Sequence, residues 1–257
     1  MEHLLYKVDE GVATVTINRP DIANAFKTEV KDEFSGLLRS IKRDRSVRAL
    51  VITGAGKTFC AGGDISTMGV MGLADGRERM RLSNEWVLEL VELEKPTIAA
   101  INGAAAGVGV GLALACDFIA MAENAKLMLS FSNLGLVPDG ATTYFMPRRI
   151  GIAKTKLIVY QGLAVSGSEA EKMGLADFSL PQEKLMEFVY QMACRLAGRP
   201  TYAIGLAKKM INYSFETDFS NYMNNEANMQ ALAFQTKDHL IGVKAFLDRT
   251  PPKFVGE

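Results

Sequence analysis

The chain has 257 residues, enough for one large domain or two small ones, and 48% of them are hydrophobic, enough to bury a full core. Its 29 Lys and Arg residues balance its 29 Asp and Glu residues, so the overall charge favours neither nucleic acid nor an anionic membrane surface as a partner. Two histidines and three separated cysteines exclude an ordinary histidine-based zinc site and argue against a Ser-His-Asp triad, so no metal is expected.

The amino terminus, MEHLLYKVDE, is charged and runs directly into a strand pattern, and no signal peptide is visible. The apolar stretch over residues 99–115 is interrupted by Asn102 and four glycines and is short for a bilayer span. We therefore expect a cytoplasmic protein that does not enter a membrane.

Strand and helix patterns alternate over about the first 190 residues. Apolar and polar residues alternate over 4–8 and 12–18 on either side of a Glu-Gly pair, which predicts an antiparallel hairpin. An amphipathic helix capped near Thr28 follows. The same criteria predict strands over 47–53, 97–101, 117–122 and 126–130, and helices over 76–94, 108–115, 152–161, 169–173, 183–196, 202–211 and 219–250.

The two ends of the chain differ in pattern. The strands of residues 1–195 look parallel and buried, whereas residues 196–257 are helical, so we predict an α/β fold with a helical C-terminal region. That region carries more large apolar side chains than a lone three-helix unit would tolerate: Phe215, Phe219, Met223, Met229, Leu232 and Phe234. We expect it to pack on the body or on another subunit.

The most informative stretch is KPTIAAINGAAAGVGVGLALACD, residues 95–117. It is apolar enough to be buried on both sides, and a loop becomes a helix at Gly107 and Val108. The first amides of a helix lack intrahelical acceptors and lie at the positive end of its dipole, so they can hold an oxyanion. Taken alone, the same pattern fits a buried helix that needs small residues for close packing.

A second glycine-rich turn occurs in KTFCAGGDI, residues 57–65. Gly62 and Gly63 can bring backbone amides close to a ligand because no side chain blocks the approach. A tight turn that requires positive φ explains this pair equally well.

One acid lies in the apolar segment FSNLGLVPDGATTYFMPRRIG, where Asp139 stands between Pro138 and Gly140. Aspartate is common in turns, and it can stabilise a turn without any role in chemistry. Alternatively, Asp139 is a general base whose pKa is raised by an apolar pocket with Phe131, Leu136, Val137 and Tyr144 nearby.

Together with NRPDIANAF (18–26) and the closing AFLDRTPPKF (245–254), these motifs span essentially the whole chain, and the sequence resembles the crotonase, or enoyl-CoA hydratase/isomerase, superfamily. The resemblance implies a crotonase-like spiral of ββα repeats over residues 1–195 and a C-terminal helical oligomerisation region over 196–257. It also implies a homotrimer, or a hexamer made of two trimers. The substrate would be an acyl-CoA thioester, with coenzyme A as part of the substrate and no separate cofactor.

The resemblance assigns the backbone amides of Gly63 and Val108 to the thioester carbonyl oxygen. It also implies a set of substrate-binding positions: Ala25, Ala61, Asp64 and Ile65 on the coenzyme A path, Phe131 and Leu136 beside the acyl group, and Lys253 and Phe254 toward a neighbouring subunit's nucleotide.

The sequence departs from the family at the acids. Hydratases of the family carry glutamates where this chain has Gly111 and Phe131, and water addition uses that carboxylate pair to activate and protonate one water. With an aspartate at position 139, the chain resembles the double-bond isomerases of the family, including the oxepin-forming isomerase, which carry an aspartate in this turn. We therefore predict an acyl-CoA isomerase in which Asp139 moves the proton.

Three alternatives remain open. The chain could be a hydratase-like enzyme with altered acids, or a catalytically silent member that binds acyl-CoA or RNA. It could also resemble aryl-CoA dehalogenases, which attack the ring with an aspartate at this turn. Those enzymes also use a histidine and a tryptophan, whereas His3 and His239 lie near the chain ends and Trp86 belongs to another helix.

Overall fold

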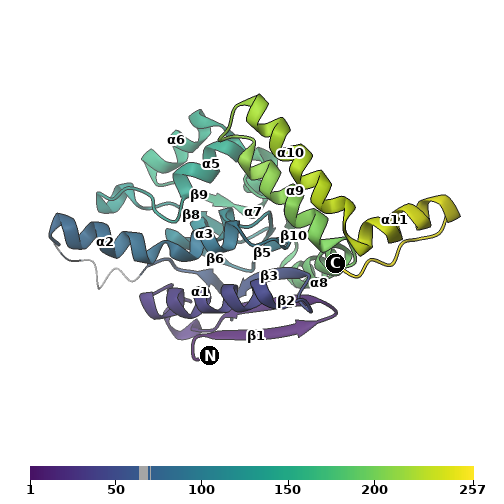
Figure 1. Ribbon diagram of the computed structural model, residues 1–257. Coiled ribbons are helices and arrows are strands. Elements are labelled where there is room, and N and C mark those ends of the chain that lie inside the picture. The colour runs from purple at the N-terminus through teal and green to yellow at the C-terminus, as the bar shows by residue number, and fades with distance from the viewer. Residues whose placement is uncertain (64–68, 70) are drawn as a thin grey trace.

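The computed structural model describes residues 1–63, 69 and 71–257 (Figure 1). Strands β1 (Leu4–Asp9) and β2 (Val12–Ile17) pair antiparallel, and the two turn residues Glu10 and Gly11 both have positive φ. Such a turn matches the right-handed twist of its strands. The predicted hairpin is therefore confirmed.

The larger sheet has six strands in the order β1-β2-β3-β5-β7-β10. From β2 onward the neighbours are parallel: β3 (Ala49–Gly54), β5 (Thr97–Ile101), β7 (Phe118–Ala122) and β10 (Phe178–Leu180). Every residue of β3 and β5 is buried, as predicted for strands covered on both faces.

A second sheet of four strands runs in the order β4-β6-β8-β9. Its members are three residues each: β4 (Thr58–Cys60), β6 (Ala104–Ala106), β8 (Lys126–Met128) and β9 (Ala164–Ser166). Each strand β3, β5 and β7 of the first sheet continues along the chain into β4, β6 or β8 of the second, and a helical segment follows. This repeat is the predicted ββα spiral.

Helices α1 (Thr28–Arg43) and α3 (Glu85–Val91) pack against each other, and the loop with Phe26 packs against α3. Helix α1 buries an apolar stripe, although its first residues lack the side-chain cap expected at Thr28. Trp86 of α3 packs edge-on against Phe26. The single helix predicted over 76–94 is wrong, because α2 (Leu73–Ser83) and α3 are separated by the non-helical Asn84.

The remaining helices follow the strands and extend to the carboxyl terminus: α5 (Thr142–Ile150), α6 (Ile152–Gln161), α7 (Gly167–Met173), α8 (Gln182–Ala197), α9 (Thr201–Tyr213), α10 (Phe219–Phe234) and α11 (Lys237–Asp248). Two short 3-10 segments, η1 (Pro20–Ile22) and η3 (Ser132–Leu134), lie in loops. The predicted helix over 219–250 is two helices, because the hydroxyl of Thr236 accepts from the His239 amide at 3.0 Å and starts α11.

Figure 1 shows α11 projecting away from the body, with the last residues running back beside it. Helix α10 buries none of its residues, and Phe215, Phe219 and Phe234 are exposed, so these side chains do not pack on the body. Their packing on another subunit stays a prediction. The predicted division after residue 195 falls within α8, which packs on β2, β3, β5 and β7, and the division stays a prediction. Among the described residues, no helix combines the length and apolar character that a membrane crossing requires.

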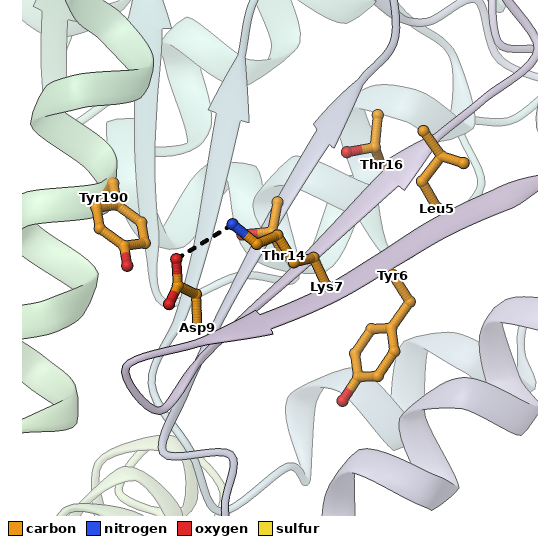
Figure 2. Close-up of a pocket in the computed structure, with 7 residues that line it drawn as sticks. All are labelled: Leu5, Tyr6, Lys7, Asp9, Thr14, Thr16 and Tyr190. Carbon is orange, nitrogen blue, oxygen red and sulfur yellow. Dashed lines mark hydrogen bonds and ion pairs between the residues drawn. The ribbon is translucent and has the colours of Figure 1, made fainter.

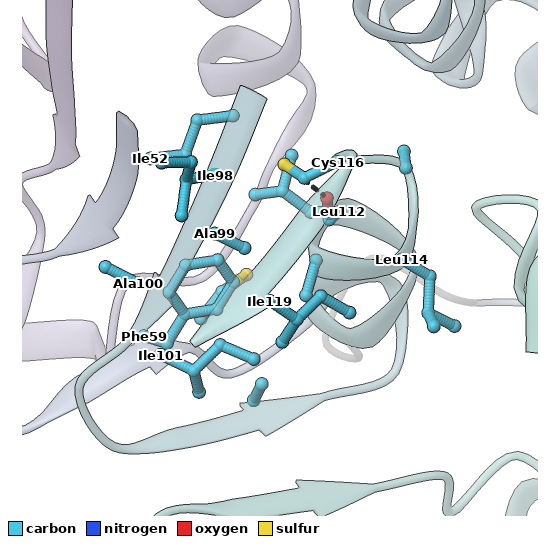
Figure 3. Close-up of a cluster of buried hydrophobic side chains, with 14 of the residues drawn as sticks. Ile52, Phe59, Ile98, Ala99, Ala100, Ile101, Leu112, Leu114, Cys116 and Ile119 are labelled. Atoms are coloured by element: carbon cyan, nitrogen blue, oxygen red, sulfur yellow. Dashed lines mark hydrogen bonds between the residues drawn. The ribbon is translucent and has the colours of Figure 1, made fainter. Parts of the chain in front are cut away.

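Helix α4 (Val108–Leu114) is buried along its whole length and packs against β4, β5 and β6. Figure 3 shows the cluster around it, to which both sheets contribute, for example Ile101 of β5 and Phe59 of β4. The core of the molecule therefore surrounds the helix that begins at the predicted oxyanion site.

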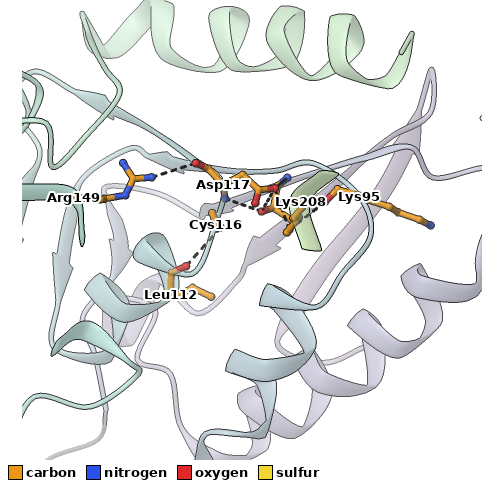
Figure 4. A network of polar contacts seen from close by, with 7 residues as sticks. Lys95, Leu112, Cys116, Asp117, Arg149 and Lys208 are labelled. Carbon is orange, nitrogen blue, oxygen red and sulfur yellow. Dashed lines mark hydrogen bonds and ion pairs between the residues drawn. The ribbon is translucent and has the colours of Figure 1, made fainter. Parts of the chain in front are cut away.

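The end of α4 is held by a polar network (Figure 4). One carboxylate oxygen of Asp117 accepts from the Thr97 amide at 2.8 Å and from the Lys208 ammonium at 3.0 Å. Arg149 donates to the Asp117 carbonyl at 3.2 Å. Because Lys208 belongs to α9 and Arg149 to α5, three separate parts of the chain are tied to this end of α4.

Candidate functional site

The two glycine-rich loops meet at one edge of the smaller sheet. Strands β4 and β6 are parallel neighbours, with Cys60 opposite Ala105, so their carboxyl ends lie side by side. Gly62 and Gly63 follow β4, and Gly107 and Val108 follow β6. The topology therefore brings together the two motifs that the sequence predicts to act together.

The approach of these loops leaves no room for side chains. A Cβ on Gly62 would lie 2.8 Å from the Ala106 carbonyl oxygen and 3.7 Å from the Gly107 Cα. Both glycines have positive φ, +94° at Gly62 and +50° at Gly107. Glycine is thus required here by backbone conformation and by contact.

The Gly63 and Val108 amides are available as donors within the described part of the chain, because neither bonds to another described backbone group. Val108 is the first residue of α4, so no residue of the helix can accept its N–H. The Val108 side chain is 2% exposed and packs away from solvent.

The turn that carries Asp139 packs directly on the start of α4. A Cβ on Gly140 would lie 3.1 Å from Val108 Cγ2 and 3.7 Å from Val108 Cα. Thr142, fully buried at the start of α5, donates from its amide at 3.2 Å and its hydroxyl at 2.8 Å to the Asp139 carbonyl. These bonds hold the Asp139 backbone in a turn whose next residue, Gly140, packs against Val108.

The same turn occupies the space of a family glutamate. A Cβ on Gly111 would lie 2.5 Å from the Gly140 carbonyl oxygen, which is far inside contact distance. Position 111 therefore cannot hold a glutamate side chain unless the 138–140 turn moves. The other glutamate position, Phe131, is 9% exposed, and its ring lies 3.5 Å from where a Cβ on Gly107 would be.

The Asp139 residue is partly buried. Its Oδ1 is buried and has no hydrogen-bond partner among the described residues. Burial raises the pKa of Asp139, as predicted, and the positive charge of Lys31 opposes that rise. The hydrogen-bonding capacity of this buried carboxylate oxygen is therefore unmet by the described residues.

Lys31 is a cationic residue whose charge acts on the Asp139 carboxyl, and the sequence interpretation did not select it. It lies on α1, is half-buried, and donates from Nζ to the hydroxyl of Ser83 at the end of α2. A lysine beside the buried helix positions Val30 and Phe34 was the available signal. A charge at the margin of an amphipathic helix usually means a solvated side chain, and only the fold brings it toward Asp139.

The other predicted binding positions divide into three groups. The loop with Ala25 lies against the loop with Ala61, since Phe26 donates to the Gly62 carbonyl at 2.8 Å and Ala61 to the Ala23 carbonyl at 3.0 Å. The predicted residues Asp64 and Ile65 lie outside the described residues.

The third group is spread over the surface. Leu136 and Val137 are 45% and 81% exposed, so they do not form the closed apolar pocket expected around Asp139. Lys253 is exposed, and Phe254 packs against Gly242 of α11 while its carbonyl accepts from Arg48 at 3.0 Å. Lys253 and Phe254 thus follow the projecting helix α11 in the chain, apart from the loops at the end of β4 and β6.

Two surface hollows lie elsewhere. One, of about 310 Å³, lies over β1 and β2 beside Tyr190 of α8 (Figure 2). The other, of about 510 Å³, lies between the end of α1 and the carboxyl-terminal residues. Neither is lined by a predicted site residue.

Comparison with known proteins shows the family to which the chain belongs. The model of the family described as Enoyl-CoA hydratase/isomerase matches residues 7–257. Over the full length of both chains, the sequence is 37% identical to 1,2-epoxyphenylacetyl-CoA isomerase of Escherichia coli (strain K12). It is 33% identical to crotonyl-CoA hydratase of Syntrophomonas wolfei, covering 100% of this chain and 99% of that one.

The fold also matches solved structures. An enoyl-CoA hydratase of Bacillus anthracis superposes with a TM-score of 0.93 at 32% identity, covering 99% of this chain and 100% of that one. The protein belongs to the enoyl-CoA hydratase/isomerase family. Its relatives include both isomerases and hydratases, so the reaction has to be argued from the residues of the site.

Proposed function

We propose that this protein is an acyl-CoA isomerase that shifts a double bond by proton transfer through an enolate. Asp139 acts as the general base, and the amides of Gly63 and Val108 form the oxyanion hole. The acyl-CoA thioester is the only substrate, and the chemistry needs no further cofactor.

The first step breaks a C–H bond. Asp139 takes a proton from the carbon α to the thioester carbonyl, and the electron pair moves onto the carbonyl oxygen to give a dienolate. The two amides stabilise the developing negative charge, and removal of one such donor typically costs about 2.7–4 kcal/mol. Because both donors belong to the backbone, the side chain at position 108 does not take part.

The second step returns the proton. The dienolate electrons form a new C–H bond at the γ carbon with the proton held by Asp139, and the double bond comes into conjugation with the thioester. The substrate and product have the same composition, and Asp139 ends as it began. One carboxyl group suffices because the α and γ carbons lie on one side of a short allylic fragment.

The observation that carries this proposal is the contrast between Asp139 and position 111. Asp139 has a buried, unpartnered carboxylate oxygen, and the next residue in its turn, Gly140, packs against Val108, the first residue of α4. The backbone of Gly140 fills the space where a hydratase would need its glutamate. This arrangement supports one-acid chemistry over the two-acid activation of water. The isomerase relative at 37% identity supports the same reaction class.

The test compares two reactions of the purified protein. Isomerisation of a 3-enoyl-CoA is followed as new conjugated thioester absorbance, and hydration of crotonyl-CoA as loss of that absorbance. We expect isomerisation to be faster by about 10²-fold, since a proton-transfer group contributes about 10² to 10⁴. Faster hydration would show a hydratase with altered acids, and acyl-CoA binding without either reaction would show a silent binding protein.

A further inference from the structure

We propose that Phe131 is a specificity-determining residue whose ring keeps water away from the start of α4, so that the proton held by Asp139 returns to the substrate without exchange with solvent. This inference rests on the proposed isomerase reaction. It gives position 131 a role in the choice of product, beyond contact with the acyl group.

The topology brings Phe131 to the same edge of the smaller sheet as the two glycine-rich loops. Strand β8 runs parallel to β6, with Met128 opposite Ala106, and the Gly107 amide donates to the Met128 carbonyl at 3.0 Å. Since β4 is also parallel to β6, the carboxyl ends of these three strands lie side by side. The third of them leads directly into Phe131.

The Phe131 ring packs on the backbone where α4 begins. A Cβ on Gly107 would lie 3.5 Å from Cζ of the ring and 4.0 Å from its Cε2. Because Gly107 has no side chain, the ring and the main chain meet with no group between them. The next residue, Val108, contacts Gly140 of the turn that carries Asp139. The ring and the acid turn therefore border consecutive residues at the start of α4.

Phe131 is held firmly in this place. Its side chain is 9% exposed, whereas all six residues that follow it, 132–137, are exposed. Its carbonyl accepts from the amides of Leu134 and Leu136, both at 3.0 Å. Phe131 is thus the buried anchor of a surface turn, and the chain runs from that turn to Asp139.

An aromatic ring in this position has two chemical consequences. A phenyl ring has no hydrogen-bonding group that could hold a water molecule beside the bound acyl group, and exclusion of water from an active site prevents leakage of protons. The proton that Asp139 takes from the α carbon is therefore the one that it returns to the γ carbon. The conjugated product is also protected, because position 131 cannot place a water that adds its hydroxyl to the β carbon and its proton to the α carbon.

The experiment follows isomerisation of a 3-enoyl-CoA in heavy water. Mass spectrometry measures deuterium at the γ carbon of the product at early conversion. A carboxyl proton that meets water exchanges rapidly, so the deuterated fraction of the product reports contact between protonated Asp139 and solvent. We expect a minor deuterated fraction for the wild type and a several-fold larger one for Phe131→Ala. Phe131→Gln, which is closer to phenylalanine in volume, should give the same rise and decides the test if Phe131→Ala does not fold.

Two controls separate exclusion of water from a role in packing. Phe131→Leu keeps an apolar side chain over Gly107 and should retain the low deuterated fraction. Leu134→Ala alters an exposed side chain of the same turn and should leave both the rate and the deuterated fraction unchanged. Loss of packing alone lowers the amount of folded protein and the rate, and it does not alter the deuterium content of the product that forms.

The outcomes distinguish this inference from the proposed reaction. Equal deuterated fractions in the wild type, Phe131→Ala and Phe131→Gln overturn the inference, and so does a wild-type product that is already mostly deuterated. In both cases isomerisation is observed and the proposed reaction stands. A wild type that binds acyl-CoA without isomerising a 3-enoyl-CoA overturns the proposed reaction, and this inference with it.

Discussion

The two walls of the candidate site are built in opposite ways. The backbone wall, Gly62–Gly63 and Gly107–Val108, consists of main chain packed so closely that a Cβ on Gly62 would lie 2.8 Å from a carbonyl oxygen. The acid wall, Pro138–Gly140, presents one side chain whose charge is opposed by burial and supported by Lys31.

In the proposed reaction, the backbone wall holds the oxyanion and the acid wall moves the proton. The backbone wall is determined by strand pairing and glycine contacts, so its amides stay in place whatever the side chains nearby. The acid wall depends on a single carboxyl, and replacement of that group can change the reaction while the fold remains. The comparison predicts that variants in the first wall act through main-chain atoms and variants in the second through charge.

The largest effect expected in the backbone wall comes from removal of a main-chain donor. Val108→Pro deletes the N–H at the first position of α4, where proline fits a helix and no intrahelical bond is lost. We expect kcat to fall by about 10² to 10³, the usual cost of one oxyanion donor. Val108→Ala keeps the N–H and serves as the control. Steady-state kinetics on a 3-enoyl-CoA make the comparison, and equal rates for the two variants would remove Val108 from the mechanism.

A somewhat smaller effect concerns the junction of the two walls. Gly111→Glu places a side chain against the Gly140 carbonyl, and overpacking of this kind costs about 1–3 kcal/mol of unfolding free energy. The variant should gain no hydration of crotonyl-CoA. The new glutamate meets the 138–140 turn, and any shift of that turn that makes room for it also moves Asp139.

Gly36→Ala is the matched control for that variant. Gly36 lies within α1 with no atom within 4 Å of an added Cβ, so alanine there should stabilise the protein by about 0.5–1 kcal/mol. Denaturant titration measures both variants. A Gly111→Glu protein that is as stable as the wild type and hydrates crotonyl-CoA would contradict the account of this junction.

The smallest expected effect is a stability change in the acid wall. The pKa of Asp139 is raised in the folded protein, so the folded state binds this proton more tightly than the unfolded chain does. The resulting stabilisation is complete below the ordinary carboxyl pKa and is lost as the pH rises through the raised value. At pH 7 the buried carboxylate therefore costs stability.

Asp139→Asn removes that cost, although Lys31 then loses its counter-charge. We expect a net gain of about 1 kcal/mol in unfolding free energy at pH 7, the low end of the penalty for a buried unsatisfied group. The gain should shrink as the pH falls toward 4. A pH series of denaturant titrations checks this, and a gain that grows with acidity would mean that the carboxyl is stabilising as an anion.

Much of the fold could be predicted from the sequence because its signals are local. The hairpin, the buried strands around Ile52 and Ile98, and the helix that starts at Val108 follow from alternation, apolar runs and glycine placement. Strands β6, β9 and β10 could not be predicted, because three residues cannot establish a period. The break at Asn84 was missed because both flanking segments are good helix formers.

The residues of the candidate site that lie in sequence motifs could be selected from the sequence. Gly63, Val108 and Asp139 were selected in separate stretches, and parallel pairing of β4 with β6 explains why two of the stretches meet. The sequence does not explain why position 111 is a glycine. The explanation is the close contact with the Gly140 carbonyl, which lies 29 positions later in the chain. Lys31 was missed for the same reason, because its electrostatic influence on Asp139 arises only in the folded chain.

The most direct test of the central claim is the turnover of Asp139→Asn on a 3-enoyl-CoA, measured beside its affinity for a non-reactive acyl-CoA. Asparagine preserves the shape of the side chain and cannot take up the proton, so kcat should fall by about 10² to 10⁴ while the Kd stays within a few-fold of the wild type. Asp9→Asn, which alters an exposed acid paired with Lys7 in β1, should change neither value. Full isomerase activity in Asp139→Asn would contradict the account.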